Sequence, residues 1–178
     1  KLFNKFEVIK SWEDLNSYFS KHGSDFILGV GGPKTRFLLT KKVIDEGGVL
    51  NSYISKRANI GNYGIEIGEG VCILPNATIT CDVRIGAGTL INKNVIISHD
   101  VVIGDFCEIS PGATVLGRAE IGDYTFIGAG AIILPDVKVG KNCIVGAGAV
   151  VTKAVPDNSV VVGIPAKYIK RNDDIVNK

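Results

Sequence analysis

The sequence predicts a mainly β protein in which short parallel strands wind into a stack of three-sided coils. The first observation is an aliphatic residue at every sixth position over most of the chain. This register comprises Ile67, Ile73, Ile79, Ile85, Ile91, Ile97, Ile103, Ile109, Val115, Ile121, Ile127, Ile133, Val139, Val145 and Val151. A fixed period is the signature of a repeat architecture, and six residues match neither a helix nor a simple hairpin.

A second stripe of residues supports the same fold. Four residues after each register position stands a small or β-branched residue: Val71, Ala77, Val83, Thr89, Val95, Val101, Cys107, Ala113, Ala119, Thr125, Ala131, Val137, Cys143, Ala149 and Val155. Each hexad therefore has two inward side chains, as alternation along a short strand requires. Aliphatic-glycine pairs recur every eighteen residues from Ile67 to Val139. Three hexads are expected to close one coil, and successive coils to stack about 4.8 Å apart.

The segment before the coils has an α/β pattern. Ser11, followed by acidic residues, predicts the start of a helix that ends near Lys21. Residues 26–30 are expected to form a short buried strand. A second helix is predicted to begin at Pro33 and to stop at Gly47.

These patterns divide the chain into three parts. We expect a partial N-terminal α/β domain over residues 1–53, a coil domain over 54–164 and a C-terminal tail over 165–178. The chain begins with Lys1 and contains no methionine, so we expect the natural N-terminus to lie upstream.

The composition indicates a small cytoplasmic protein without nucleic-acid or membrane partners. A chain of 178 residues that is 46% hydrophobic supports one compact domain with an appendage. The net charge of +2 gives no electrostatic case for nucleic acid. No apolar run reaches the roughly 18 residues of a membrane span, and no signal peptide is evident. The four cysteines lack paired zinc spacing, and Cys107 and Cys143 are expected to fill the core as reduced thiols.

The hexad, with glycine commonly after the aliphatic residue, resembles the hexapeptide-repeat acyltransferases. The resemblance covers roughly residues 54–169 and implies a left-handed parallel β-helix. It also implies a homotrimer with three active sites between neighbouring prisms. Residues 25–60 look like the end of the nucleotide-sugar-binding domain of one branch, the sialic-acid O-acetyltransferases and amino-sugar N-acetyltransferases. The glycine-rich nucleotide-binding turn of that branch is not in this sequence, and Gly29, Gly31 and Gly32 are expected to form only a tight turn.

The string VIISHDVVIGDFCEISPGATVLG resembles the active-site coil of this family. The resemblance implies that His99 is the general base and that Asp100 orients its imidazole. It further implies that Asn92 contacts the acceptor group of the sugar and that the Gly117 amide stabilises the oxyanion. From the repeat alone, each has a structural alternative: a solvated histidine, a solvated turn carboxylate, a turn-forming asparagine and a corner glycine.

The coenzyme site is also expected from resemblance. Ala129 and Ala147, in the strings IGAGA and VGAGA, match backbone positions that hydrogen-bond the pantetheine arm of coenzyme A. The segment VGAGAVVTKAVPDNSVVVGIPAKYIKR resembles the closing segment of the superfamily, with residues 163–167 leading off a last coil. Its basic residues Lys167 and Arg171, with Lys170, are suited to the coenzyme phosphates.

One position departs from the family pattern. Glu108 stands where many relatives carry a second histidine, which can contact the acetyl donor. A carboxylate cannot donate a hydrogen bond unless it is protonated, so we expect a different donor contact or a different acceptor specificity.

Three classes of function fit the sequence. The leading one is an acetyl-CoA-dependent acetyltransferase acting by direct transfer on a nucleotide-linked amino sugar or a sialic acid, in surface-polysaccharide or glycan-precursor synthesis. A non-catalytic β-helix scaffold would bind no acetyl-CoA. A metalloenzyme like the γ-class carbonic anhydrases would need three histidine ligands per zinc, whereas the coils contain only His99, so no metal is expected. The choice between an amino group and a hydroxyl stays open.

Overall fold

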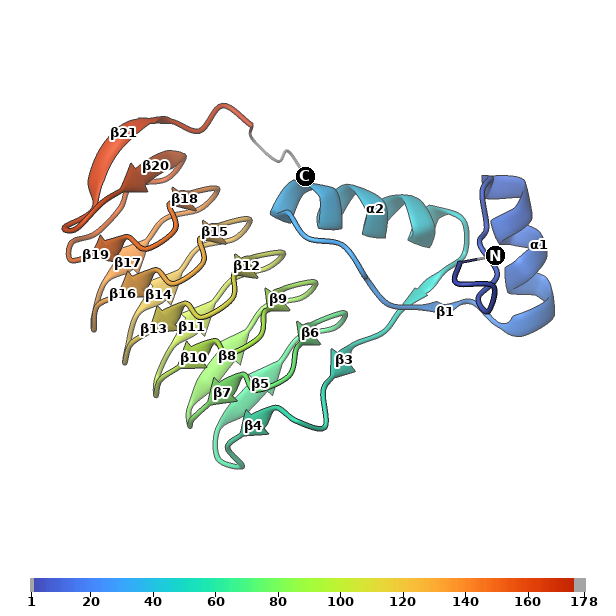
Figure 1. The fold of residues 1–178 in the computed structure, drawn as a ribbon, viewed down its shortest axis with the longest axis horizontal. Helices are drawn as coiled ribbons and strands as arrows, with labels where there is room; N and C mark the ends of the chain where they lie inside the picture. Colours follow the sequence, from blue (N-terminus) through green and yellow to red (C-terminus); the bar gives the residue numbers. More distant parts are fainter. Residues whose placement is uncertain (1, 175–178) are drawn as a thin grey trace.

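The chain folds into a left-handed parallel β-helix with a small α/β unit beside it (Figure 1). The computed structural model describes residues 2–174, so Lys1 and the last four residues of the predicted tail lie outside the described part. From residue 65 to residue 151 the short strands pair in parallel with the strand eighteen residues further on, as Ile97 does with Val115. The predicted fold class and the three-hexad coil are therefore confirmed.

Three sheets form the sides of the prism, and we name them by what lies outside them. The covered sheet contains β3 (Tyr53–Ile54), β6 (Cys72–Ile73), β9 (Leu90–Ile91), β12 (Glu108–Ile109), β15 (Phe126–Ile127), β18 (Ile144–Val145), β20 (Ser159–Val162) and β21 (Lys167–Arg171). The apolar sheet contains β4 (Asn59–Ile60), β7 (Thr78–Ile79), β10 (Ile96–Ile97), β13 (Thr114–Val115), β16 (Ile132–Ile133) and β19 (Val150–Val151). The charged sheet contains β5 (Ile65–Ile67), β8 (Val83–Ile85), β11 (Val102–Ile103), β14 (Glu120–Ile121) and β17 (Lys138–Val139).

The two predicted stripes fill the interior of the prism. Register residues from Ile73 to Val151 are at most 2% exposed, and only Ile67 in the first coil is half-buried. The polar residues Thr89 and Thr125 also point inward. Each hydroxyl donates to a glycine carbonyl, at 2.9 and 2.8 Å, so neither is left unpaired in the core. Close packing of these aliphatic layers is the main source of stability.

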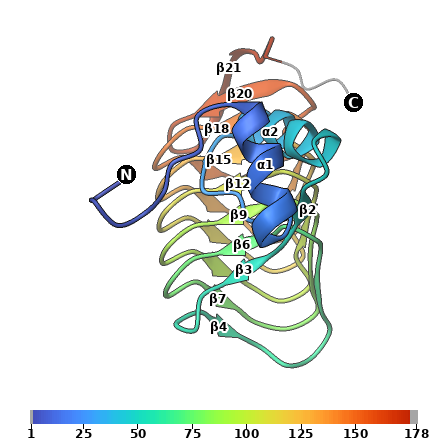
Figure 2. The ribbon, with the colours of Figure 1, turned by 90° about the vertical axis from the view of Figure 1, so that its right-hand side faces the viewer.

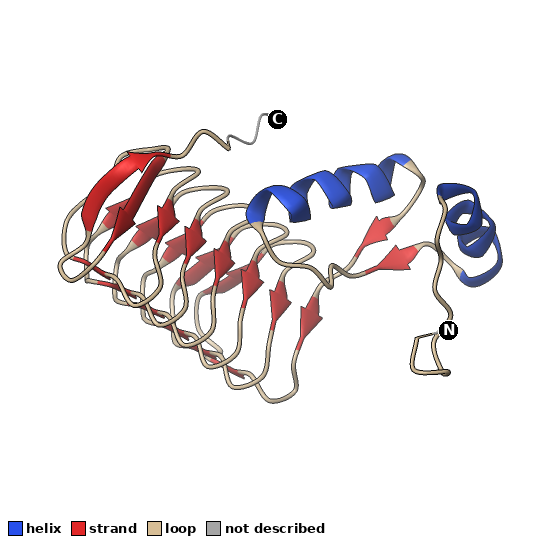
Figure 3. Cartoon of the chain, turned by 45° about the horizontal axis from the view of Figure 1, so that its top comes forward, coloured by secondary structure: helices blue, strands red, loops and turns tan. Residues whose placement is uncertain are grey.

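The N-terminal unit comprises α1 (Trp12–His22), β1 (Asp25–Phe26), α2 (Pro33–Asp45) and β2 (Val49–Leu50). Both predicted helices are confirmed, and α2 lies nearer the coils than α1 (Figures 1 and 3). The strand predicted over residues 26–30 is wrong beyond Phe26. The carbonyl oxygens of Leu28 and Val30 accept hydrogen bonds from the buried Arg36 guanidinium instead of pairing with a strand. Neither helix within residues 2–174 has the length and apolar character needed to cross a bilayer.

Helix α2 is fastened to the prism by an aromatic cluster. Phe37 packs edge-on against Phe106 and Tyr124, with ring centroids 5.3 and 5.5 Å away. Phe106 and Tyr124 occupy turn positions with φ of 50° and 57°, which bulky residues rarely adopt. Arg36 adds a 2.7 Å hydrogen bond from Nε to the carbonyl of Gly88. These contacts place the unit in front of the covered sheet (Figure 2).

The C-terminal segment closes the stack by reversing direction. Strand β20 continues the covered sheet in parallel with β18, but β21 runs antiparallel to β20. The expectation that residues 163–167 lead off a further coil is therefore wrong. Gly163, with φ of 97°, permits the reversal, and Pro165 has no N–H for a further ladder. The hairpin covers an otherwise open strand edge, and Asn172 ties it down by donating to the Asn142 carbonyl.

Candidate active site

His99 lies on the edge between the apolar and charged sheets, in the turn that follows β10. Its Nδ1 is 2.7 Å from Oδ2 of Asp100, and both side chains are about half exposed. Asp100 adopts a φ of 59°, and its N–H donates to the carbonyl of Cys81 one coil earlier. If Nδ1 donates to the carboxylate, Nε2 keeps a lone pair that can accept a proton.

Gly117 occupies the equivalent turn position one coil further on. Its own corner is closed by a hydrogen bond from Ala119 to Leu116, and its neighbour Arg118 donates its N–H to the carbonyl of His99 at 3.0 Å. A Cβ at Gly117 would lie 2.7 Å from His99 Nε2, so a side chain here would force the imidazole to move. The Gly117 N–H donates to no group within residues 2–174. It is therefore available to an oxyanion near His99.

Asn92 and Glu108 lie in a different place, on the outside of the covered sheet. They line one cavity of about 420 Å³ together with the loop that precedes α2. Glu108 is buried, and its Oε2 accepts a 2.6 Å hydrogen bond from the N–H of Gly32. Its other oxygen is 3.5 Å from the Ser110 hydroxyl. The remaining wall is largely apolar and includes Leu28, Val30, Tyr53, Leu74 and Leu90.

Ala129 and Ala147 lie on the edge between the covered and apolar sheets, one coil apart and both exposed. The Ala129 carbonyl accepts from Gly148, but the N–H groups of both alanines are unused among residues 2–174. Nothing lies within 4 Å of a Cβ built on Gly130 or Gly148. The edge is thus a smooth strip with free backbone amides, which suits an extended amide-containing ligand.

The basic residues of the tail lie on β21, at the C-terminal end of the stack (Figure 1). Lys167 and Arg171 are exposed there, as is Lys170. Arg171 has a loose contact with Asp173, with 3.8 Å between Nε and Oδ1. An anionic ligand could therefore reach this strand from solvent.

The predicted catalytic residues and the two alanines of the predicted coenzyme site lie on opposite edges of the apolar sheet. His99, Asp100 and Gly117 meet on one edge. On the other edge, Ala129 and Ala147 follow the same corner as Asn92, as the eighteen-residue spacing predicts. A single chain therefore does not bring the histidine to the strip of free amides. The sequence reading missed Gly32 as the partner of Glu108, because 76 residues separate the two.

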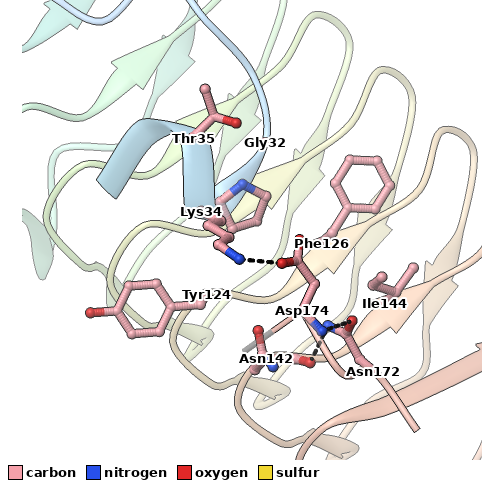
Figure 4. Close-up of a pocket in the computed structure, with 10 residues that line it drawn as sticks. Gly32, Lys34, Thr35, Tyr124, Phe126, Asn142, Ile144, Asn172 and Asp174 are labelled. Carbon is pink, nitrogen blue, oxygen red and sulfur yellow. Dashed lines mark hydrogen bonds and ion pairs between the residues drawn. The ribbon is translucent and has the colours of Figure 1, made fainter. Parts of the chain in front are cut away.

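Another cavity, of about 190 Å³, opens at the N-terminal end of α2 (Figure 4). Its lining includes Tyr124, Phe126 and the ion pair of Lys34 with Asp174. None of the predicted site residues lines it. Across residues 2–174 we also find no group of three or more His, Cys, Asp or Glu side chains that could hold a metal ion.

Comparisons with known proteins agree with the fold. A family model described as bacterial transferase hexapeptide (six repeats) matches residues 82–117 and 118–153. The structure is similar to PerB from Caulobacter crescentus in complex with CoA and GDP-perosamine, with 30% identity, a TM-score of 0.85 and coverage of 89% of this chain and 76% of that one. The structure is also similar to that of a mutant perosamine N-acetyltransferase from the same organism in complex with CoA and GDP-perosamine, with 30% identity and a TM-score of 0.85.

Two further structures match over more of this chain. One is the acetyltransferase domain of PglB from Neisseria gonorrhoeae in complex with acetyl coenzyme A, with 31% identity, a TM-score of 0.85 and coverage of 93% of this chain and 80% of that one. The other is WeeI from Acinetobacter baumannii, with 31% identity, a TM-score of 0.85 and coverage of 93% and 81%. No curated protein sequence matches the chain.

Proposed function

This chain belongs to the hexapeptide-repeat sugar acetyltransferases, and we propose that it transfers the acetyl group of acetyl-CoA directly to an amino group of a nucleotide-linked sugar. An amine is favoured over a hydroxyl because a similar structure is named as a perosamine N-acetyltransferase and holds CoA and GDP-perosamine. A sialic-acid hydroxyl is the competing acceptor.

The observation that carries this proposal is the placement of His99 between Asp100 and Gly117. The Asp100 carboxylate holds Nδ1 at 2.7 Å, and Gly117 of the next coil adjoins the imidazole and has an unused N–H. Transfer from a thioester to an amine needs a base for the proton and a donor for the developing oxyanion. His99 can supply the base and Gly117, one coil further on, the oxyanion donor.

In the proposed step, Nε2 of His99 takes a proton from the acceptor nitrogen as that nitrogen forms a bond to the thioester carbonyl carbon. The carbonyl oxygen gains the negative charge and accepts the Gly117 N–H. Collapse of this adduct breaks the carbon–sulfur bond, and the departing thiolate receives the proton from His99. A positioned base contributes about 10² to 10⁴ in rate, and one oxyanion donor about 10² to 10³.

We assign the coenzyme to the strip of free amides. The unused N–H groups of Ala129 and Ala147 would hydrogen-bond the pantetheine arm, and the adjacent glycines leave room for it. Lys167 and Arg171 on β21 would meet the phosphates.

The cavity beside the covered sheet is assigned to the sugar. Asn92 would contact the acceptor group, and Glu108 would lie near the acetyl end of the donor, as the family pattern implies. The loop of the N-terminal α/β domain (residues 1–53) forms one wall of this cavity, which supports a role for that domain in holding the sugar.

A homotrimer would complete the site. The covered sheet is occupied by the α2 unit, and the charged sheet carries the ion pairs Glu66 with Arg84 and Glu120 with Lys138. Among residues 2–174 no element covers the apolar sheet, and its outward Ile96 is 45% exposed. Three prisms whose apolar sheets face a common axis would bring the His99 edge of one copy against the alanine strip of the next.

The proposal is tested by incubating the protein with acetyl-CoA and either nucleotide-linked amino sugars or free sialic acids while following thiol release. Mass spectrometry should show a nucleotide-linked amino sugar gaining one hydroxylamine-stable acetyl group. His99→Ala should lower kcat at least about tenfold while the trimer survives. Unchanged turnover would remove His99 from the mechanism, and absence of acetyl-CoA binding by calorimetry would favour the scaffold.

A further inference from the structure

A column of charged side chains runs along the edge that carries His99. Asp82, Asp100, Arg118 and Asp136 follow one another at eighteen-residue steps, so they occupy the same turn position in four successive coils. All four have left-handed backbone, with φ of 52°, 59°, 60° and 62°. Since coils stack about 4.8 Å apart, Arg118 has one carboxylate a coil before it and another a coil after it.

Arg118 is committed to only one of these two carboxylates. Its Nε is 2.6 Å from Oδ1 of Asp136, and its Nη2 is 2.9 Å from Oδ2. This is the two-pronged geometry that a planar guanidinium prefers, and it engages one carboxylate at a time. Asp100 meanwhile offers its Oδ2 to His99 at 2.7 Å.

The Asp100 carboxylate is nevertheless within electrostatic reach of the guanidinium. The pKa of Arg118 is raised first by its hydrogen bond to Asp136, then by the charge of Asp136, and also by the charge of Asp100. The pKa of Asp136 is lowered, mainly by the same hydrogen bond. Asp100 is thus the alternative partner that Arg118 would meet if Asp136 were neutral.

We propose that Asp136 is a positioning residue for the reaction: it holds the Arg118 guanidinium away from Asp100, so that Asp100 stays hydrogen-bonded to His99. The inference rests on the proposed role of His99 as the base. Without Asp136, the guanidinium turns to Asp100 and competes with the imidazole for its carboxylate. His99 then loses the contact that orients Nε2 toward the acceptor.

The first variant is Asp136→Asn, because asparagine tolerates the left-handed backbone as well as aspartate does. We expect kcat to fall about tenfold with little change in the KM for acetyl-CoA. The unfolding temperature should stay close to that of the wild type, since exposed ion pairs contribute little to folding.

The second variant separates competition from a structural role. In Asp136→Asn combined with Arg118→Ala the competitor is gone, so kcat should return to within about twofold of Arg118→Ala alone. Asp82→Asn is the matched control. It removes a carboxylate from the same column and turn position, but on the side of Asp100 away from Arg118, and kcat should not change.

Three results would overturn the inference: an unchanged kcat in Asp136→Asn, a double variant as slow as Asp136→Asn, or a loss confined to the KM for acetyl-CoA. The His99→Ala variant keeps the two proposals distinguishable. If His99→Ala retains full turnover, the proposed base is wrong. If His99→Ala is inactive while Asp136→Asn is normal, only the role of Asp136 fails.

Discussion

Gly117 and His99 stand in contact across two successive coils, and the contact leaves no room for a side chain on the glycine. A Cβ at Gly117 would lie 2.6 Å from Cε1 of the imidazole and 2.7 Å from Nε2. The backbone of Gly117 is not in the left-handed region, so conformation alone does not demand glycine here. The imidazole does.

Gly117→Ala should therefore disable the site without disturbing the fold. The added methyl group pushes the imidazole off its contact with Asp100 and also covers the free N–H. We expect kcat to fall about a hundredfold. Because the side chain of His99 is half exposed and can turn into solvent, the unfolding temperature should hardly change. Pro135→Ala, at the same corner one coil further on, is the control and should leave kcat intact.

Ala147→Leu should weaken coenzyme binding. The leucine side chain would project over the strip of free amides and displace the pantetheine arm, so the Kd for coenzyme A measured by calorimetry should rise about tenfold. Ala147→Gly is the control at the same position, because it keeps the strip open and the N–H in place. Equal affinity in the leucine variant and the wild type would place the coenzyme elsewhere.

The sequence was sufficient to predict where a residue lies in the fold wherever the eighteen-residue period determines its place in the coil. It placed His99 and Gly117 at one corner of adjacent coils, and the structure has them in contact. It could not place Glu108 against Gly32, because the period says only that Glu108 faces outward. What lies outside depends on how α2 docks, which is a tertiary property.

Local preferences failed where a tertiary contact outweighed them. Residues 26–30 have the apolar character of a strand, but Arg36 takes the carbonyl groups that a strand would use. Phe106 and Tyr124 occupy left-handed turn positions that favour glycine or asparagine. Their packing against Phe37 offsets a conformational cost of about 1 to 2 kcal/mol each.

Ile96→Asp should break the proposed trimer. Its side chain stands 45% exposed on the apolar sheet, and a buried carboxylate between neighbouring prisms would have no partner. Light scattering after size exclusion should show a monomer, and acetyl transfer should be lost because the two edges of the site no longer meet. Val102→Asp is the matched control: Val102 is a branched aliphatic residue, 39% exposed, on the charged sheet. It should remain trimeric, and a trimeric Ile96→Asp would point to another interface.

Cys107 makes the stability of the protein depend on alkaline pH. Burial raises the pKa of its thiol from 9.0 to about 12. Above pH 9 the thiol ionises in the unfolded chain but stays neutral in the folded one. The contribution of the buried thiol to the free energy of unfolding is therefore complete below pH 9 and is lost as the pH rises toward 12. Between pH 8.5 and 10.5 the loss amounts to about 2 kcal/mol.

Cys107→Ala provides the test, because alanine already fills the same inward stripe at positions such as Ala113 and Ala119. Urea unfolding at pH 8.5 and 10.5 should show the free energy of unfolding falling by about 2 kcal/mol less in the variant than in the wild type. The smaller side chain lowers stability at both values of pH. The effect of ionisation is therefore read only from the change in the free energy of unfolding between pH 8.5 and pH 10.5. Parallel losses in the two proteins would mean that the thiol ionises as readily in the folded chain as in the unfolded one.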